Sequence, residues 1–516
     1  MNLRHASRLG LTVGASALAL ALLPAASASA HGDRPGDTPT NSRSKQVATQ
    51  GSGPAMRHVA NLQYDATGKA QNGSDIEFAK IAGKEYALAG TLRKGMQIID
   101  ITDPETPRIA AVYDCAVSQG DIQVWRTGPR VLASYTADGT FGAAGAASQC
   151  ARDLGLKSGA SGTVIVDISN PTAPQTVSFV PVPLGSHNMT IHPSGDYLYN
   201  SNSDLITSTS PTITIYDISQ PENPRKVQDF PIPFVPLSLG SESHDITFNA
   251  SGTRAYSAAL SQTLILDTVD PANPSVVSQT LDPSINVVHQ SDPVTLKRAD
   301  GSKREVMVIT DERAGAAASA ECPGGGLHLY DITGPKERAP EKIGTWFIPV
   351  AKVQDGATCT SHVLRIYPKQ ELMTIAWYTQ GVRVIDLSGL ADFEGSAAAV
   401  GFGDGVGMKE VGHFTLPDSD TWSFKTNKIN KDGSFYGYGN DLVRGFDVYE
   451  YSGETIGDVA PLTPTDLLPV AVNAPAASSD LVGSTALKAT SGGIVAVIVA
   501  PALLLAARKR RRNSRA

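Results

Sequence analysis

The chain has 516 residues and a formal net charge of −7, from 43 lysines and arginines against 50 aspartates and glutamates. Residues 1–30 and 508–516 hold basic side chains but no acidic one, so the chain between them is more acidic than this balance suggests. An acidic surface argues against nucleic acid and anionic lipid as partners, and it leaves metal cations and cationic ligands open.

Residues 1–30 have the pattern of a secretory signal peptide. Arginines precede an apolar stretch over residues 9–23, and the small-residue site Ala28-Ser29-Ala30 follows. We therefore expect an exported protein, whose fold begins after this segment. Residues 31–55 are rich in Gly, Pro, Ser, Thr and Asn and are predicted to be disordered.

One short unit recurs seven times along the chain. In its fourth copy, the apolar run at residues 264–266 is too short for a helix and predicts a buried strand that Asp267 ends. Pro271 and Pro274 then predict a tight turn before a second strand. The equivalent aspartates, which we expect to form side-chain-to-backbone turns, are Asp100, Asp167, Asp217, Asp267, Asp331, Asp386 and Asp447.

Two further strands precede each of these hairpins, so each unit is a four-stranded antiparallel meander of strands a to d. The seventh copy ends at Tyr451 without strand d, whereas residues 56–65 resemble strand d and have no partner strand before them. A strand from the opposite end of the chain that completes the last blade leaves no free edge. The sequence therefore predicts an all-β fold, a seven-bladed β-propeller over residues 56–452 that its N-terminal strand closes.

The segment after the propeller has two parts. Residues 453–488 are rich in Pro, Ala, Thr and Ser, which predicts an extended stalk. Residues 489–507 carry no charge and basic residues follow at 508–516, the pattern of a transmembrane helix with a cytoplasmic tail. We expect a single-pass protein of the cell membrane whose propeller is extracellular. Attachment to the cell wall is an alternative, because residues 487–491 loosely resemble a sortase signal.

The strand-c sequences TVIVDIS from Thr163, VRVIDLS from Val382 and MQIIDIT from Met96 resemble the LVIVD repeat. This repeat is a propeller-forming unit of exported prokaryotic proteins, and the resemblance extends over roughly residues 56–451. It implies the propeller fold and a place at the cell surface. It implies no particular chemistry, since the family has no single assigned activity.

The four cysteines of an exported chain predict two disulfides. Three pairings are possible, and the order along the chain favours Cys115–Cys150 and Cys322–Cys359. Each of these pairs joins a d–a connection to a b–c loop, and in a propeller both kinds of loop lie on the same face. We interpret the disulfides as structural.

Histidines occupy one repeated position, the start of strand a, in four consecutive copies. They are His187, His244, His289 and His362, and Asp420 holds the same position in the seventh copy. Imidazoles that converge at the end of a channel suit zinc, copper or iron. The sequence therefore indicates a candidate site for a divalent transition metal with these five residues as ligands.

An alternative places each histidine in a hydrogen-bond network inside its own blade, with the strand-c aspartate as in WD-repeat propellers. Asp121 and Asp245 follow the same position in their copies, and Trp422 lies close to it, so these three are candidates for ligand contact. Residues 311–313, Asp-Glu-Arg, are interpreted as a solvated or salt-bridged rim.

The sequence contains no nucleophile elbow, phosphate-binding loop, zinc-protease motif or dinucleotide fingerprint. We therefore expect a monomeric binding or scaffold module at the cell surface, whose partner is an extracellular protein or a small ligand. The alternative is a metal-dependent extracellular enzyme with a histidine-lined site at the end of the channel. No catalytic residue is identified from the sequence.

Overall fold

The computed structural model describes residues 51–53, 55–65, 70–117, 119–141, 143–312, 323–349 and 359–467. The predicted signal peptide, the predicted transmembrane helix and most of the predicted stalk lie outside these residues. In the part of the chain that is described, no helix is long and apolar enough to cross a membrane.

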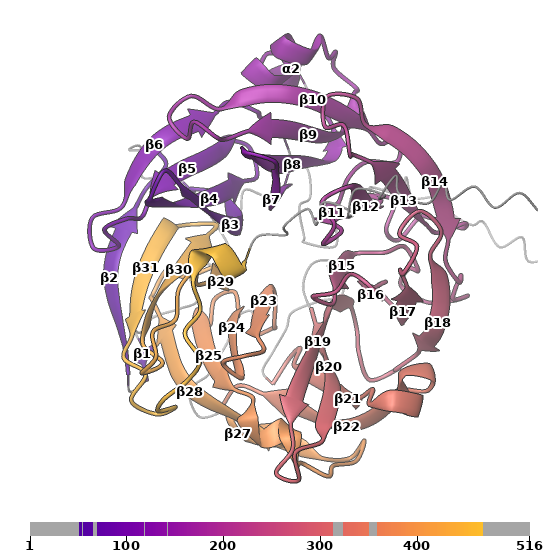
Figure 1. Ribbon diagram of the computed structural model, residues 1–516, viewed down its shortest axis with the longest axis vertical. Coiled ribbons are helices and arrows are strands. Elements are labelled where there is room, and N and C mark those ends of the chain that lie inside the picture. Colours follow the sequence, from indigo (N-terminus) through magenta and orange to yellow (C-terminus); the bar gives the residue numbers. More distant parts are fainter. Residues whose placement is uncertain are drawn as a thin grey trace, which may run out of the picture. The chain divides into compact units, whose positions relative to one another are not determined.

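Seven four-stranded antiparallel blades surround a central channel, which confirms the predicted propeller (Figure 1). The strands of each blade are given from the innermost outward. Blade 1 contains β3 (Gly73–Ile81), β4 (Lys84–Thr91), β5 (Met96–Asp100) and β6 (Arg108–Tyr113), and blade 2 contains β7 (Gln119–Thr127), β8 (Arg130–Thr140), β9 (Ser161–Asp167) and β10 (Gln175–Pro181). Blade 3 contains β11 (Asn188–Ile191), β12 (Tyr197–Ser201), β13 (Thr212–Asp217) and β14 (Arg225–Pro231), and blade 4 contains β15 (Asp245–Phe248), β16 (Arg254–Ala258), β17 (Thr263–Asp267) and β18 (Ser275–Thr280).

Blade 5 contains β19 (Val288–Lys297), β20 (Lys303–Asp311), β21 (Leu327–Asp331) and β22 (Glu341–Phe347). Blade 6 contains β23 (Leu364–Tyr367), β24 (Leu372–Ala376), β25 (Val382–Asp386) and β28 (Met408–Thr415). Blade 7 contains β29 (Thr421–Lys425), β30 (Phe435–Asp441), β31 (Gly445–Tyr451) and β2 (Met56–Leu62). The short strands β26 (Val400–Phe402) and β27 (Asp404–Gly405) join blades 5 and 6 into one sheet, and β1 (Gly51–Ser52) pairs with β28. The helical turns are α1 (Ala143–Ala146), α2 (Gln149–Leu154), η2 (Gly334–Arg338), η4 (Ser388–Ala391) and η5 (Pro464–Asp466).

The third strand of each blade is apolar throughout because neighbouring blades pack against both of its faces. In β17, Leu264 and Leu266 belong to the core cluster shared with blade 3, whereas Ile265 belongs to the cluster shared with blade 5. Successive side chains of a strand point to opposite faces, so an uninterrupted apolar run fills both interfaces. Burial of one such side chain stabilises the fold by roughly 1.5–3 kcal/mol.

Six of the seven strand-c aspartates form the predicted turns. The carboxylate of Asp217 accepts the backbone N–H of Ser219, two residues ahead, at 3.0 Å. The same contact recurs at Asp100, Asp167, Asp267, Asp331 and Asp386. Asp447, in the closing blade, instead binds His58 at 2.8 Å and Arg444 at 2.9 Å.

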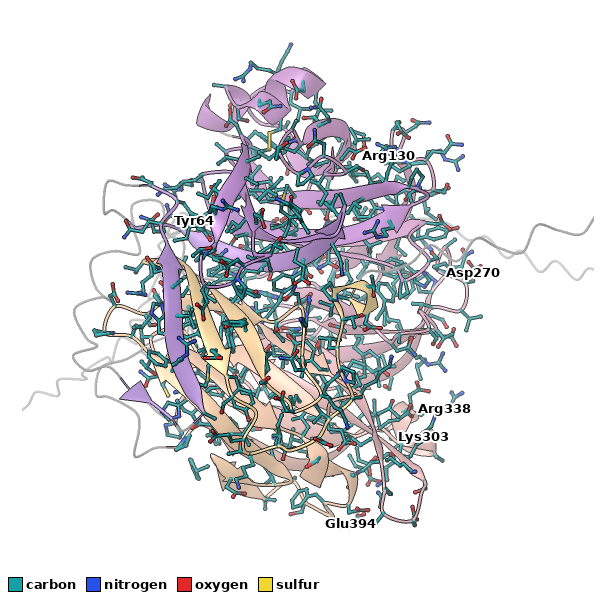
Figure 2. The ribbon with its side chains drawn as sticks, turned by 60° about the vertical axis from the view of Figure 1, so that its left-hand side comes forward. Tyr64, Arg130, Asp270, Lys303, Arg338 and Glu394 are labelled. Carbon is teal, nitrogen blue, oxygen red and sulfur yellow. A yellow bond between two sulfur atoms is a disulfide. The ribbon has the colours of Figure 1, made fainter. Side chains whose placement is uncertain are left out.

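The predicted closure of the ring is present. β2 pairs antiparallel with β31, from Met56 opposite Tyr451 to Leu62 opposite Phe446. Figures 1 and 2 show this indigo strand alongside the yellow strands of blade 7. One blade thus contains both ends of the propeller sequence, and the outer edge of β31 is covered.

Residues 453–467 differ from the extended stalk that we expected from residue 453. Leu462 and Ile429 exchange two backbone hydrogen bonds, and Gln370 donates to the carbonyl of Ala460 at 2.8 Å. The physical reason is that Leu462 and Leu467 give this segment an apolar side to bury. The segment therefore lies across the propeller, and its helical turn η5 lies over the centre of the ring beside β3 and β29 (Figure 1).

The predicted disulfide between Cys115 and Cys150 is present and joins the β6–β7 connection to α2. It is the yellow bond near the top of Figure 2. Cys359 is also in a disulfide, and Cys322, its predicted partner, lies outside the described residues.

Candidate metal centre

The four histidines lie side by side at one end of the channel. Their ring centroids are 4.3 Å apart between His187 and His244, 4.3 Å between His244 and His289, and 4.4 Å between His289 and His362. All four side chains are buried. They come together because each stands at or just before the start of an innermost strand, and these strands all begin at the same end of the channel.

The strand-c aspartates lie at the opposite end of their blades. In blade 3, the backbone N–H of His187 donates to the carbonyl of Ser201 at the end of β12, whereas Asp217 is paired with Tyr197 at the start of β12. The contacts between the imidazoles therefore run from blade to blade. The structure has this arrangement in place of the network inside each blade that we considered from the sequence.

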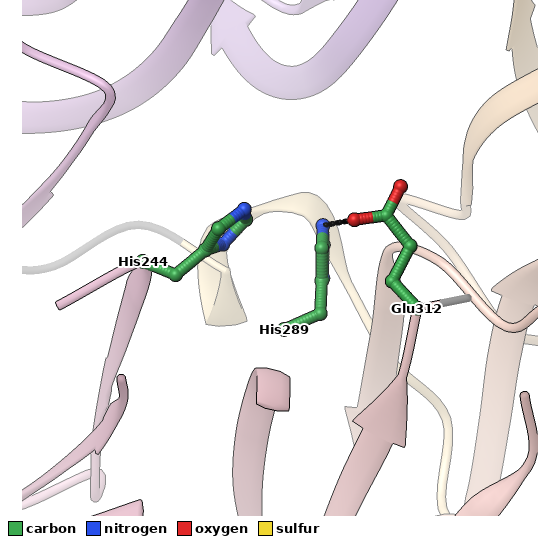
Figure 3. Close-up of side chains that lie close together, drawn as sticks. All are labelled: His244, His289 and Glu312. Atoms are coloured by element: carbon green, nitrogen blue, oxygen red, sulfur yellow. Dashed lines mark ion pairs between the residues drawn. The ribbon is translucent and has the colours of Figure 1, made fainter. Parts of the chain in front are cut away.

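Glu312 joins the histidines and is the residue that the sequence interpretation missed. Donor atoms of His244, His289 and Glu312 all lie within 4.8 Å of one another (Figure 3). The two carboxylate oxygens of Glu312 are 3.8 Å from Nε2 of His289 and 3.8 Å from Nε2 of His362. Residues 311–313 were interpreted as a solvated or salt-bridged rim. The solvated alternative is wrong for Glu312, which is fully buried and lies within ion-pair distance of His289 and His362. Its place just after β20 puts it at the same end of the channel as the starts of the innermost strands.

Contacts around this cluster fix the orientation of its members. Nδ1 of His362 lies 2.6 Å from the carbonyl oxygen of Trp422. A carbonyl can only accept, so Nδ1 carries a proton, and in the neutral ring Nε2, which faces Glu312, has the lone pair. The hydroxyl of Tyr378 donates to Oε1 of Glu312 at 2.6 Å. Partners of this kind hold metal ligands in place.

His187 is held in a similar way from the other side. Its Nδ1 lies 2.8 Å from a carboxylate oxygen of Asp138 in β8, and its Nε2 lies 2.9 Å from Nε2 of His244. When His187 is neutral, Nδ1 donates to Asp138 and Nε2 accepts the proton of His244. His244 then has its lone pair on Nδ1. Asp138 and Glu312 stand at equivalent places, one residue beyond the partners of Gln119 and Val288 at the end of the second strand, and each faces the histidine of the next blade.

Asp420 and Trp422 lie close to this end of the channel in blade 7. Asp420 is buried, and its backbone N–H donates to Asp441 at 2.7 Å. Its carboxylate is not among the three donor groups that lie within 4.8 Å of one another. Trp422 packs edge-on against His362, with ring centroids 4.7 Å apart. The tryptophan therefore positions a histidine as well as lining the channel.

A cavity of about 560 Å³ occupies the channel next to the histidines. His244, His289 and His362 line one end of it, and Leu462 and Leu467 line the other. Between them the innermost strands present polar and charged side chains, which include Asp75, Glu77, Asp121, Asp245, Arg365 and Lys425. Asp121 and Asp245, which the sequence indicated as candidates for ligand contact, thus line this cavity.

The charges in the cavity are unevenly compensated. Nζ of Lys425 lies 2.6 Å from Asp75 and 3.0 Å from Glu77, and Arg365 also pairs with Glu77. Although burial alone would raise the pKa of Glu77, these two cations hold it below its usual value. Burial and the carboxylates of Asp75 and Asp245 raise the pKa of Asp121 well above its usual value.

Residues 159–180, in the second copy of the unit, match the family model of the LVIVD repeat. No curated protein matches the chain. Similar solved structures include the β-propeller domain of Cps50 (Swd1) from Myceliophteria thermophila, with 10% identity and a TM-score of 0.44 over 75% of this chain and 99% of that one. The periplasmic gluconolactonase PpgL from Pseudomonas aeruginosa has 11% identity and a TM-score of 0.45 over 73% and 99% of the two chains. A functionally unknown protein from Desulfotomaculum acetoxidans has 13% identity and a TM-score of 0.38 over 63% and 87%.

Proposed function

We propose that this LVIVD-repeat β-propeller binds a divalent transition-metal ion at one end of its channel and, next to it, a small ligand in the channel. The observation that carries the proposal is the convergence of His244, His289 and Glu312, whose donor atoms lie within 4.8 Å of one another in a buried site.

The donor set suits zinc or a similar ion. Zinc in proteins is bound by imidazole nitrogen and carboxylate oxygen at about 2.0–2.2 Å, so ligand atoms around one ion lie roughly 3.3–3.6 Å apart. Nε2 of His289 and Oε2 of Glu312 are 3.8 Å apart. Small movements of these side chains would bring them to bonding distance, and Nε2 of His362 is placed to act as a further donor.

The ion would be accessible from the channel. His244, His289 and His362 all line the cavity, so a molecule there would contact the metal directly. This geometry supports a binding module in the first place. It also supports a metal-dependent enzyme as a second candidate, because an open coordination position next to a cavity is what metal catalysis requires.

A place outside the cell is part of the proposal. The signal-peptide pattern and the uncharged segment before the basic tail support a single-pass membrane protein, and the Cys115–Cys150 disulfide suits an oxidising compartment. We propose that the propeller acts there as a monomer.

Metal analysis of the purified propeller tests the proposal. After dialysis against zinc and then against metal-free buffer, we expect about one zinc per chain by mass spectrometry of the elements. The variants His289→Gln and Glu312→Gln should each retain less than a tenth of the zinc that the wild-type protein holds. His192→Gln is the matched control, because His192 is buried in blade 3 and binds the carbonyl of Gly252. Equal zinc in the wild-type protein and both site variants would refute the metal site.

A further inference from the structure

Three carboxylates form an arc in the channel beside the histidines. Asp75, Asp121 and Asp245 lie on β3, β7 and β15, the innermost strands of blades 1, 2 and 4, and all three line the cavity. In each of these blades the aspartate stands at the same level of the innermost strand. The arc is a repeated feature of the channel wall, distinct from the donor atoms of the proposed metal site.

The cations of the cavity compensate only one end of this arc. Lys425 binds Asp75 and Glu77, and Arg365 binds Glu77. Asp245 accepts the backbone N–H of Ile246 at 2.7 Å. Asp121 lines the cavity and is only 8% exposed, and its Oδ2 receives no hydrogen bond from an N–H group or a hydroxyl. Its side-chain hydrogen-bond partner is another carboxyl group, that of Asp75. Two buried carboxyl groups in contact are costly when ionised, so an N–H donor from a ligand would stabilise them.

The spacing of the arc argues for an organic cation over a bare metal ion. Within the described residues, the donor atoms of His244, His289 and Glu312 are the only set of three or more that come within 4.8 Å of one another. The three aspartates are therefore too far apart to share one ion. An ammonium group has several N–H donors that point in different directions and can reach separate carboxylates.

We propose that the channel binds a small organic ammonium compound whose charged nitrogen lies between Asp121 and Asp245. The cavity of about 560 Å³ is within the usual size of small-molecule sites. This proposal names the class of the small ligand in the proposed function and rests on that part of it. It does not depend on the metal site, because neither aspartate belongs to the metal-binding set. It is consistent with the acidic composition, which leaves cationic ligands open.

Calorimetric titration with 1,4-diaminobutane tests the proposal, with 1,4-butanediol as the neutral probe of matched shape. The buffer contains a chelator, so that metal takes no part. We expect the diamine to bind and the diol not to bind. Asp121→Asn and Asp245→Asn should each weaken diamine binding at least tenfold, whereas Asp404→Asn, at an exposed site in β27, should leave it unchanged.

The two site variants are expected to fold, because each removes a buried or partly buried carboxyl group that forms no ion pair with a lysine or arginine in direct contact; Lys425 acts on both only from a distance. Unchanged circular dichroism and thermal melting check this. A second measurement is proton release on binding, from titrations in buffers of different ionisation enthalpy. The charged neighbours of Asp121 are Asp75, Asp245 and Lys425, and an ammonium between the aspartates should lower the raised pKa of Asp121, so that binding releases protons. This release should disappear in Asp121→Asn.

No heat from the diamine, or equal binding by wild-type protein and both variants, would refute the ammonium site. The Glu312→Gln variant separates the two proposals. It should bind the diamine as the wild-type protein does while losing zinc. Diamine binding without any zinc binding would refute the metal site alone.

Discussion

Asp331, the strand-c aspartate of blade 5, shows how single residues stabilise the blade ends. It accepts the backbone N–H of Thr333 at 3.0 Å, and it pairs with Lys336 at 2.9 Å and with buried Arg304 at 3.3 Å. Burial alone would raise its pKa, but these contacts lower the pKa from 3.8 to about 2. The ionised form is therefore favoured in the folded protein.

A pH-dependent contribution to stability follows from this shift. Because the folded-state pKa is depressed, the contribution is complete above about pH 4 and is lost as the pH falls from about 4 to about 2. Asp331→Asn should lower the free energy of unfolding by roughly 2 kcal/mol at pH 7. Urea unfolding at both ends of the range checks this, and a difference that persists undiminished at pH 2 would contradict it.

Tyr378 is the residue that positions the carboxylate of the proposed metal site. Its hydroxyl donates to Oε1 of Glu312 at 2.6 Å, so Tyr378→Phe should weaken zinc affinity about 10–100-fold while all ligand atoms remain. Competition with a chromophoric chelator measures this. Tyr199→Phe is the control, since the Tyr199 hydroxyl binds the carbonyl of Pro271. Equal affinity in the two variants would show that Tyr378 does not position Glu312.

Among the elements, β2 is the strand on which the closed ring depends. It covers the edge of β31, and Met56 at its start is part of the core of blade 7. Deletion of residues 31–65 should expose that edge and cause aggregation, with a lower melting temperature. Deletion of residues 31–50 alone keeps β1 and β2, so it should neither cause aggregation nor lower the melting temperature. Light scattering and thermal melting compare the two, and a monomeric, equally stable 31–65 deletion would contradict the role of β2.

The elements could be predicted from the sequence wherever a residue recurs in every copy. The apolar run before Asp267 and its equivalents predicts the blades, the unpartnered strand at residues 56–65 predicts the closure, and the shared position of the histidines predicts their convergence. Each of these depends on local pattern and on the symmetry of the ring. The pairing of Cys115 with Cys150 follows from the same topology.

Glu312 and Asp138 occupy equivalent places at the ends of the second strands of blades 5 and 2, but they were missed because the other copies do not share an acidic residue there. Each lies at or near the end of a second strand in a single blade, and whether such a residue reaches the channel depends on loops that differ between copies. The packing of residues 453–467 against the propeller could not be predicted either. Their composition indicates a stalk, but Leu462 and Leu467 find an apolar surface that only the assembled ring creates.

For the whole molecule, the channel brings together residues from every blade, and both proposed sites lie in it. One end holds buried histidines and Glu312. The polar cavity beside them holds Asp121 and Asp245 as well as the carboxylates that pair with Lys425 and Arg365. Seven blades of one repeat provide the same scaffold, and the residues at the inner strand starts differ from blade to blade. A propeller of this kind can therefore present a metal ion and a ligand site on one rigid wall.

The most direct test of the metal site is anomalous diffraction from crystals of the propeller soaked in zinc, with data collected on both sides of the zinc absorption edge. The account predicts one strong anomalous peak about 2.0–2.2 Å from imidazole nitrogens of His244 and His289 and from a carboxylate oxygen of Glu312. Crystals of Glu312→Gln should lack it. A map without a peak among these three residues, or with zinc only at exposed side chains, would contradict the account.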